Sequence, residues 1–230
     1  DFVPSRGLGD VYKRQIQRSV PGYSTVVAMS GVLAERYAVS NSSIYDLGCS
    51  LGATSLAMAD KIHVSGQENC RIIAVDNSES MLDKFKFQLK ERPLDSPTIE
   101  LVLSNVQDVE ISHASVVALN YTLQFIPLES RSEVIKKIYQ GMLPEAVLIL
   151  SEKVHFEDSA VNEVYVDLHH EFKRANGYSN LEISQKRQAL EDVLRAETLD
   201  RHKQRLQACG FRRVEVWFQC LNFASLIAFK

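Results

Sequence analysis

The chain has 230 residues, a formal net charge of −3 and a hydrophobic share of 45 %. These values predict one α/β domain with a core of ordinary size and room for one insertion. The mildly acidic balance offers no surface that follows phosphates, so direct nucleic-acid binding is not expected. No apolar run approaches the roughly 20 residues of a membrane-spanning helix, and no signal peptide is visible. We therefore expect a cytoplasmic protein without membrane contact.

The first fifteen residues differ in character from the rest. Asp10–Gln15 matches what the end of a common sequencing-library transposon encodes in this frame. We expect residues 1–15 to be a non-native scar and residues 16–230 to form a single domain. A genuine polar N-terminal arm remains the alternative.

Strand and helix patterns alternate through the first two thirds of the chain. A turn at Pro21–Tyr23 precedes the first of these elements, and Ser78 is a candidate helix N-cap. The expected helices are 26–39, 51–62, 79–91 and 131–141, and the expected strands are 44–47, 72–75, 99–103, 115–120 and 146–150. This alternation predicts right-handed crossovers and a mostly parallel sheet.

The pattern changes near residue 151. Residues 152–196 are polar and helical, without a strand signal, and we expect them to form a cap over the site. A helix over 197–209 follows and ends at Gly210. Two β-rich runs, 211–218 and 221–229, predict a closing pair with an antiparallel last strand. The fold class is therefore α/β and Rossmann-like, with the seven-stranded sheet of class I methyltransferases.

The turn after the first strand carries the most specific signal. It has the order Asp46-x-Gly48-x-Ser50-x-Gly52, whereas a dinucleotide loop needs G-x-G-x-x-G to close on a pyrophosphate. An acid before the first glycine repels phosphate but suits a cationic ligand with an ammonium group, such as S-adenosylmethionine (SAM). The alternative that Asp46 is a buried structural acid stays open.

Polar residues end the next strands, where doubly wound sheets bind ligands. Asp76 can accept both ribose hydroxyls of an adenosine, although it could instead cap the helix that follows. Asn105 and Val106 stand where such folds place an adenine-binding acid. Asn120 ends the fourth strand and faces the same pocket, unless it only forms a turn.

The four cysteines and the histidines of the expected cap suggest no metal centre. Cys49, Cys70, Cys209 and Cys220 form no C-x-x-C pair, so reduced thiols are expected. His169 and His170 lack a third ligand at zinc spacing. The many cap cations suggest a solvated face, and the pattern alone assigns none of them to the pocket.

Several motifs together carry a resemblance to a known family. They are the cap segments 169–178 and 182–187, Gln17–Tyr23, Tyr45–Ser50, Leu119–Phe125 and Trp217–Phe223. In this combination the chain, from about Ile16 to Lys230, resembles carboxy-S-adenosyl-L-methionine (carboxy-SAM) synthases. The resemblance implies a homodimeric enzyme that converts SAM and prephenate to carboxy-SAM and phenylpyruvate. It also implies that the product serves carboxymethylation of wobble uridines in tRNA by a separate enzyme.

The resemblance also implies roles for individual residues. The SAM contacts it implies are Tyr23, Gly48, Cys49, Ser50, Asp76, Asn77, Asn105, Val106 and Asn120. It assigns Arg187 to the new carboxylate, which a planar guanidinium can hold with two hydrogen bonds. The sulfonium acidifies its methyl group, and loss of a proton gives an ylide that can capture carbon dioxide from prephenate. Asn105 departs from the aspartate usual in the family.

Two rival functions remain. A methyltransferase on the same fold would release S-adenosylhomocysteine and would have no evident use for Arg187. A protein that binds SAM or carboxy-SAM without turnover would retain its ligand and form no product.

Overall fold

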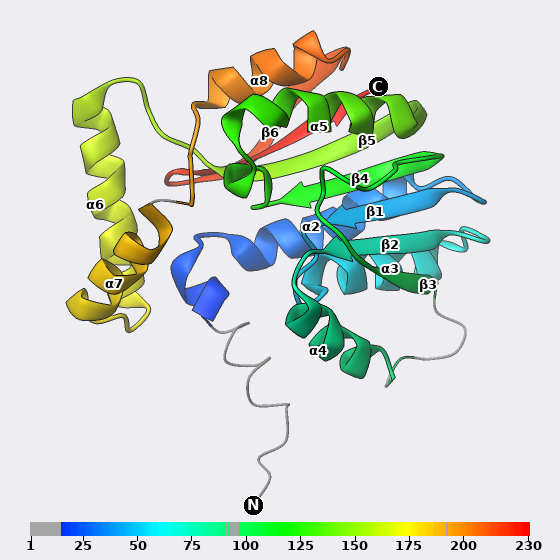
Figure 1. Ribbon diagram of the computed structural model, residues 1–230, viewed down its shortest axis with the longest axis horizontal. Helices are drawn as coiled ribbons and strands as arrows, with labels where there is room; N and C mark the ends of the chain where they lie inside the picture. Colours follow the sequence, from blue (N-terminus) through cyan, green and yellow to red (C-terminus); the bar gives the residue numbers. More distant parts are fainter. Residues whose placement is uncertain (1–14, 91, 93–96, 192) are drawn as a thin grey trace, which may run out of the picture.

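The protein forms one seven-stranded sheet in a computed structural model that describes residues 15–90, 92, 97–191 and 193–230, with only the backbone for 186–191 (Figure 1). The strand order is β3-β2-β1-β4-β5-β7-β6, and β7 is antiparallel to both of its neighbours. The strands are β1 Ser43–Leu47, β2 Arg71–Asp76, β3 Thr98–Leu103, β4 Ala114–Asn120, β5 Met142–Lys153, β6 Arg213–Cys220 and β7 Phe223–Phe229. The predicted parallel sheet with a reversed last strand is confirmed.

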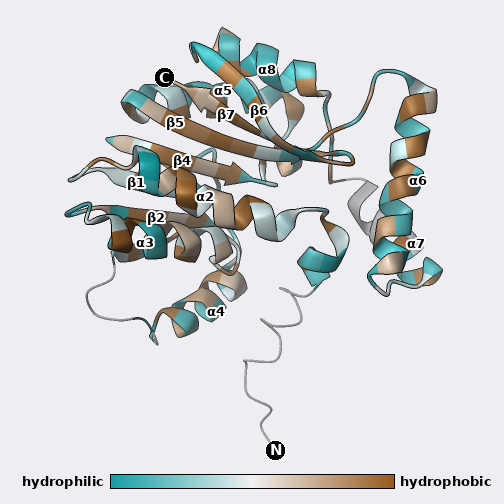
Figure 2. Ribbon diagram, turned by 180° about the vertical axis from the view of Figure 1, so that it is seen from behind, coloured by the Kyte–Doolittle hydropathy of each residue, from teal (hydrophilic) through white to brown (hydrophobic). Residues whose placement is uncertain are grey.

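Helices cover both faces of the sheet. Those of one face are α2 Tyr23–Tyr37, α3 Ala53–Ser65 and α4 Glu79–Leu89, and those of the other are α5 Leu128–Gly141 and α8 Leu199–Ala208, beside the short 3-10 turn η1 Leu123–Phe125. Figure 2 shows α2 and α3 in front of the hydrophobic strands. Ile44 and Ile72 pack toward α2 and α3, whereas Leu47 and Val75 belong to the cluster of the opposite face. The central strands are therefore hydrophobic without a polar alternation, as parallel strands buried on both faces should be.

Some boundaries differ from those predicted. β5 continues to Lys153, because Glu152 and Lys153 pair with Ala224 and Phe223 of β7. The expectation of no strand within residues 152–196 is therefore wrong for these two positions. α8 begins only after Thr198, whose hydroxyl accepts a hydrogen bond from the Arg201 N–H. Pairing with β7, which is distant in sequence, sets the end of β5, and the capping side chain of Thr198 sets the start of α8.

The segment after β5 carries two helices. α6, Ser159–Ala175, is capped by Asp158, whose carboxylate accepts the Val161 N–H, and α7 spans Asn180–Glu191. Figure 1 shows both helices beyond the end of the sheet at which β4 and β5 finish. The N-terminal residues hold this segment, since Arg18 donates to the carbonyls of Asn176 and Gly177. The expected scar falls almost wholly on residues 1–14, which lie outside the described part of the chain.

Within the described ranges, no helix is both long enough and apolar enough to cross a bilayer. The same part of the chain contains no cluster of three His, Cys, Asp or Glu side chains suited to a metal ion. All four cysteines are described and are free.

A buried ion cluster ties α5 and α8 to the end of the cap segment. Arg131 is fully buried, and its guanidinium donates to Glu197 as well as to the carbonyls of Gln124, Ile126 and Arg195. Arg205 donates to the other oxygen of Glu197. One carboxylate therefore neutralises two guanidinium groups that have little access to water.

Glu197→Gln is expected to lower the free energy of unfolding by about 3–5 kcal/mol, because it leaves two buried cations without their anion. Burial opposes the charged form of Glu197, but Arg205 and Arg131 outweigh it and hold its pKa below the usual 4.5. A lowered pKa stabilises the fold at neutral pH, and this contribution is lost as acidification protonates the folded carboxylate, below about pH 4.5.

Urea unfolding at pH 7 and pH 4 measures this effect, and the difference between wild type and variant should shrink at the lower pH. Glu145→Gln is the matched control, since Glu145 pairs with Arg212 at the surface and should cost less than about 1 kcal/mol. An equal cost for both variants would contradict the assignment.

Candidate functional site

The turn after β1 is held against the end of β2. The N–H groups of Gly48 and Cys49 both donate to the Val75 carbonyl, at 2.8 and 2.9 Å. Gly48 has φ 82°, and a β-carbon there would collide with Thr122. Gly52 has φ 79° at the start of α3, where a β-carbon would collide with Phe85. Both glycines are therefore required by conformation and by close approach.

Asp76 links this turn to the end of β2. One of its carboxylate oxygens accepts the Ser50 N–H at 2.8 Å, and the other accepts the Ser78 N–H at 2.9 Å. Ser78 occupies the N-cap position of α4, but its hydroxyl makes no capping bond. The predicted side-chain cap by Ser78 is therefore wrong, and Asp76 accepts only the N–H of Ser78 itself. Each carboxylate oxygen of Asp76 still has acceptor capacity for a ribose hydroxyl.

The side chain of Ser50 places a polar atom in the turn between β1 and α3. Its hydroxyl oxygen is buried and has no hydrogen-bond partner among the described residues. An unpaired buried hydroxyl costs free energy. A polar ligand in the turn between β1 and α3 would give this hydroxyl the partner that it lacks.

The loops after β2 and β3 meet through amide side chains. Asn77 donates to the Asn105 side-chain oxygen at 3.2 Å, and Asn105 donates to Asp108 at 2.9 Å. The carboxylate of Asp108 thereby orients the Asn105 amide with its oxygen away from Asp108. The Val106 side chain is buried in the core, so any adenine contact from this residue falls to its backbone.

Asn120 lies at the end of β4 with its amide already engaged. It donates to Ser30 of α2 at 3.2 Å and to Thr54 of α3 at 3.4 Å, and its side-chain oxygen accepts from Ser151 at 2.6 Å. The side chain therefore joins α2, α3, β4 and β5 at the edge of the site. One acceptor lone pair remains for a ligand.

A carboxylate, that of Asp46, and a thiol, that of Cys49, are buried at the turn after β1. Asp46 is 2 % exposed and accepts the Ser55 hydroxyl, so it fits the structural alternative and adds negative charge under the turn. Burial, with a contribution from Asp76, raises its pKa to about 6. Burial likewise raises the pKa of the Cys49 thiol well above its usual range, so Cys49 is no nucleophile at neutral pH.

Tyr23, the first residue of α2, belongs to a row of rings beside the loops. Its ring centroid lies 6.1 Å from that of Tyr121, which lies 6.1 Å from that of Phe223. Tyr121 follows Asn120 directly and has φ 58°, a conformation that is rare outside glycine. The aromatic row therefore extends from the predicted SAM contacts toward the cap.

Glu152 is a supporting residue that the sequence patterns did not single out. It is fully buried at the end of β5, and its carboxylate accepts the N–H groups of Thr122, Leu123 and Gln124 at 2.9–3.2 Å. Burial raises its pKa to about 8, while these N–H groups and Arg131 favour the charged form. Glu152 fixes the segment that packs on Gly48. The sequence signal that could have identified Glu152 is the presence of an acid close to the end of an apolar strand run.

Arg187 lies on α7, and its side chain is outside the described residues. The structure thus brings the loops after β1, β2, β3 and β4 together through hydrogen bonds and close contacts, whereas the Arg187 guanidinium lies outside the described part of the chain.

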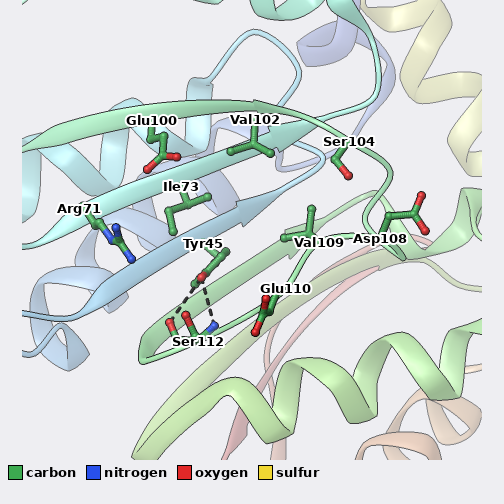
Figure 3. Close-up of a pocket in the computed structure, with 10 residues that line it drawn as sticks. All are labelled: Tyr45, Arg71, Ile73, Glu100, Val102, Ser104, Asp108, Val109, Glu110 and Ser112. Atoms are coloured by element: carbon green, nitrogen blue, oxygen red, sulfur yellow. Dashed lines mark hydrogen bonds between the residues drawn. The ribbon is translucent and has the colours of Figure 1, made fainter.

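A separate hollow of about 400 Å³ lies on the face of the sheet toward the β3–β4 connection (Figure 3). Tyr45, Ile73 and Val102 form its floor, and Glu100 and Glu110 stand at its rim. None of the predicted SAM contacts lines it. The strand-end edge, with Gly48, Asp76 and Asn105, is a different location.

The strand order, the antiparallel β7, the glycine turn and the acid at the end of β2 together define the class I SAM-dependent methyltransferase fold. A family model described as a methyltransferase domain matches residues 44–145. Solved structures share the fold: a SAM-dependent methyltransferase from Methanosarcina mazei has TM-score 0.60 and 16 % identity, covering 85 % of this chain and 95 % of that one. Human N-acetylserotonin methyltransferase in complex with SAM has TM-score 0.55 and 15 % identity, covering 87 % and 51 %.

Curated relatives narrow this class. The carboxy-S-adenosyl-L-methionine synthase of Aliivibrio salmonicida is 51 % identical over the whole of this chain and 93 % of its own length. The enzyme of the same name from Photobacterium profundum is 49 % identical over the same shares. The chain belongs to the carboxy-S-adenosyl-L-methionine synthase family, a family of transferases, and the resemblance seen in the sequence is confirmed.

Proposed function

We propose that this protein converts SAM and prephenate to carboxy-SAM and phenylpyruvate. The observation that carries the proposal is the 51 % identity, across the full chain, to a carboxy-SAM synthase. The methyltransferase fold with an acid at the end of β2 supports SAM as the first substrate. We further propose a cytoplasmic homodimer whose product supplies tRNA carboxymethylation by another enzyme.

The residues suit an adenosine held at the strand ends. Asp76 accepts the ribose hydroxyls, and the Ser50 hydroxyl gains the polar partner that it lacks in the described structure. Asn105 and the Val106 backbone contact the adenine, with Asp108 fixing the orientation of the Asn105 amide. Gly48 and Cys49 form the wall of the turn, while Tyr23, Asn77 and Asn120 complete the surroundings.

The proposed reaction balances without an added oxidant or reductant. The S-methyl carbon gives up a proton and forms a bond to the carboxyl carbon of prephenate. Prephenate breaks its bond between the ring and that carboxyl group, its ring hydroxyl departs with an electron pair, and the ring becomes aromatic. The proton and the hydroxide leave as water. Arg187 binds the new carboxylate, which lies between its guanidinium and the sulfonium.

Carboxy-SAM should appear only when the purified protein receives both SAM and prephenate, as judged by mass spectrometry of all sulfonium and thioether products. A requirement for both substrates is expected because prephenate supplies the carboxyl group. Omission of either substrate is the control. Prephenate-independent S-adenosylhomocysteine, formed with a methyl acceptor, would instead identify a methyltransferase, and retained SAM without any product would identify a binding protein.

A further inference from the structure

The loop that follows β4 lies against three of the residues expected to contact SAM. Thr122 packs on Gly48, since a β-carbon at Gly48 would collide with the Thr122 side chain. The Thr122 hydroxyl donates to the Asn120 carbonyl at 3.1 Å. The ring centroid of Tyr121 lies 6.1 Å from that of Tyr23. The position of this loop therefore helps to shape the site proposed for SAM.

The loop leaves β4 in a conformation that gathers its N–H groups. Tyr121 has φ 58°, in the left-handed region, and its N–H donates to the Ser151 carbonyl at 2.6 Å. Thr122 then returns to the right-handed helical region. Successive N–H groups around such a pair of conformations form a concavity that binds anions. The loop thus offers a place for a negative charge beside the end of β5.

The carboxylate of Glu152 occupies this concavity. One of its oxygens accepts the N–H groups of Thr122 and Leu123 at 3.2 and 2.9 Å, and the other accepts that of Gln124 at 2.9 Å. Glu152 is fully buried, and a buried carboxylate is costly unless hydrogen bonds compensate it. Together with the Ser151 carbonyl, it binds four consecutive N–H groups of the loop.

Gly48 links the position of the loop to the turn proposed for SAM. Its N–H donates to the Val75 carbonyl, and two residues later the Ser50 N–H donates to the Asp76 carboxylate. Glycine has no side chain to restrict its conformation, so the contact with Thr122 limits the conformations open to Gly48. A displaced loop would free this glycine, and with it the turn that carries Ser50.

We propose that Glu152 is a positioning residue for SAM binding. Its carboxylate holds the loop with Thr122 against Gly48 and with the Tyr121 ring in the aromatic row. The inference rests on the proposed function, because its ligand is the first substrate of that reaction. SAM binds the molecules in which the loop is held, so the fraction of such molecules sets the apparent affinity.

Glu152→Gln tests this assignment, because it keeps the size of the side chain and replaces one acceptor oxygen by an NH2 donor. At least one of the three N–H groups then loses its partner. The Kd and the KM for SAM are expected to rise about tenfold, as they would if the loop were held in about a tenth of the molecules. The kcat at saturating SAM should stay within about twofold, because bound SAM selects the molecules with the loop in place.

Ile138→Ala on α5 is the matched control for lost stability. Ile138 is buried in the same core cluster as Leu123, so its truncation destabilises the fold without removing a hydrogen bond from the loop. It should lower the melting temperature and leave the Kd of SAM within about twofold. A rise in Kd equal to that of Glu152→Gln would show that lost stability alone explains the effect, and would overturn the inference.

Thr122→Ala keeps the backbone N–H groups and removes the side-chain atoms that contact Gly48. It should raise the Kd of SAM about threefold to tenfold, by the same reduction in the fraction of molecules with the loop in place. Both changes act on one contact, so the double variant should lose less than the product of the two factors. Factors that multiply, or an unchanged Kd in folded Glu152→Gln, would overturn the inference. If Glu152→Gln fails to fold, Glu152→Asp replaces it, since the shorter carboxylate should raise the Kd at least about threefold.

Calorimetric titration with S-adenosylhomocysteine gives these affinities without turnover. The adenosine, the ribose and the amino acid part of the ligand are unchanged, so the same order of affinities is expected as for SAM. A wild type that binds this ligand but forms no carboxy-SAM from SAM and prephenate would overturn the proposed function and leave the test of Glu152 intact. The two failures are therefore distinguishable.

Discussion

Arg187→Leu is expected to reduce carboxy-SAM formation on the order of a hundredfold or more while SAM still binds. The physical reason is that removal of one partner of a hydrogen-bonded charge pair leaves the other charge unpaired. The new carboxylate exists only after the reaction has begun, so SAM itself loses no contact. The effect should therefore appear in kcat and in carboxy-SAM affinity, and much less in the KM for SAM.

The measurement is the ratio of the dissociation constants of carboxy-SAM and SAM, taken beside the rate of product formation. Wild type should prefer carboxy-SAM, and Arg187→Leu should lose that preference. Arg187→Lys should recover only part of it, since an ammonium cannot reproduce two parallel hydrogen bonds. Lys186→Leu changes the neighbouring cation and should leave the ratio unchanged. Full carboxy-SAM formation and binding by Arg187→Leu would show that the role is assigned wrongly.

The parts of the fold that the sequence predicted well are those with local causes. Ile44–Leu47 and Ile72–Val75 are buried on both faces, and such strands are visible as short apolar runs. The glycine turn is visible because only glycine tolerates φ 82° together with contact from Thr122. Asp76 could be placed at the site because a strand end and a turn meet there.

The less predictable parts depend on partners far away in the chain. Arg131 and Glu197 are charged residues of the kind usually found at a solvated surface. They nevertheless form a buried ion pair although they are 66 residues apart in the chain. Most of the cap cations were expected to face solvent, and nothing in the sequence pattern indicated that Lys173 and the neighbouring His169 are buried. No periodicity of charge distinguishes these cases, since burial of a charged group follows from the tertiary position of its helix.

Asp76→Asn should weaken SAM binding by about a hundredfold, since a charged acceptor of two ribose hydroxyls becomes a neutral amide and each such bond contributes roughly 1.5–3 kcal/mol. The structure shows a second task for this carboxylate, because it also accepts the N–H groups of Ser50 and Ser78. A change in loop stability alone could therefore weaken SAM binding as well. The ribose contact and the loop support need separate measurements.

A double-mutant cycle that compares the binding of S-adenosylhomocysteine with that of its 2′-deoxy analogue separates the two tasks. If Asp76 binds the ribose, loss of the 2′-hydroxyl should weaken binding to wild type by at least tenfold but should matter little in Asp76→Asn, because the partner is already altered. If Asp76 only holds Ser50 and Ser78 in place, both proteins should lose the same factor. Asp83→Asn, an exposed acid on α4, serves as the control and should bind both ligands like wild type. Calorimetric titration of the two ligands against these three proteins therefore assigns the carboxylate to substrate binding, to loop support or to both.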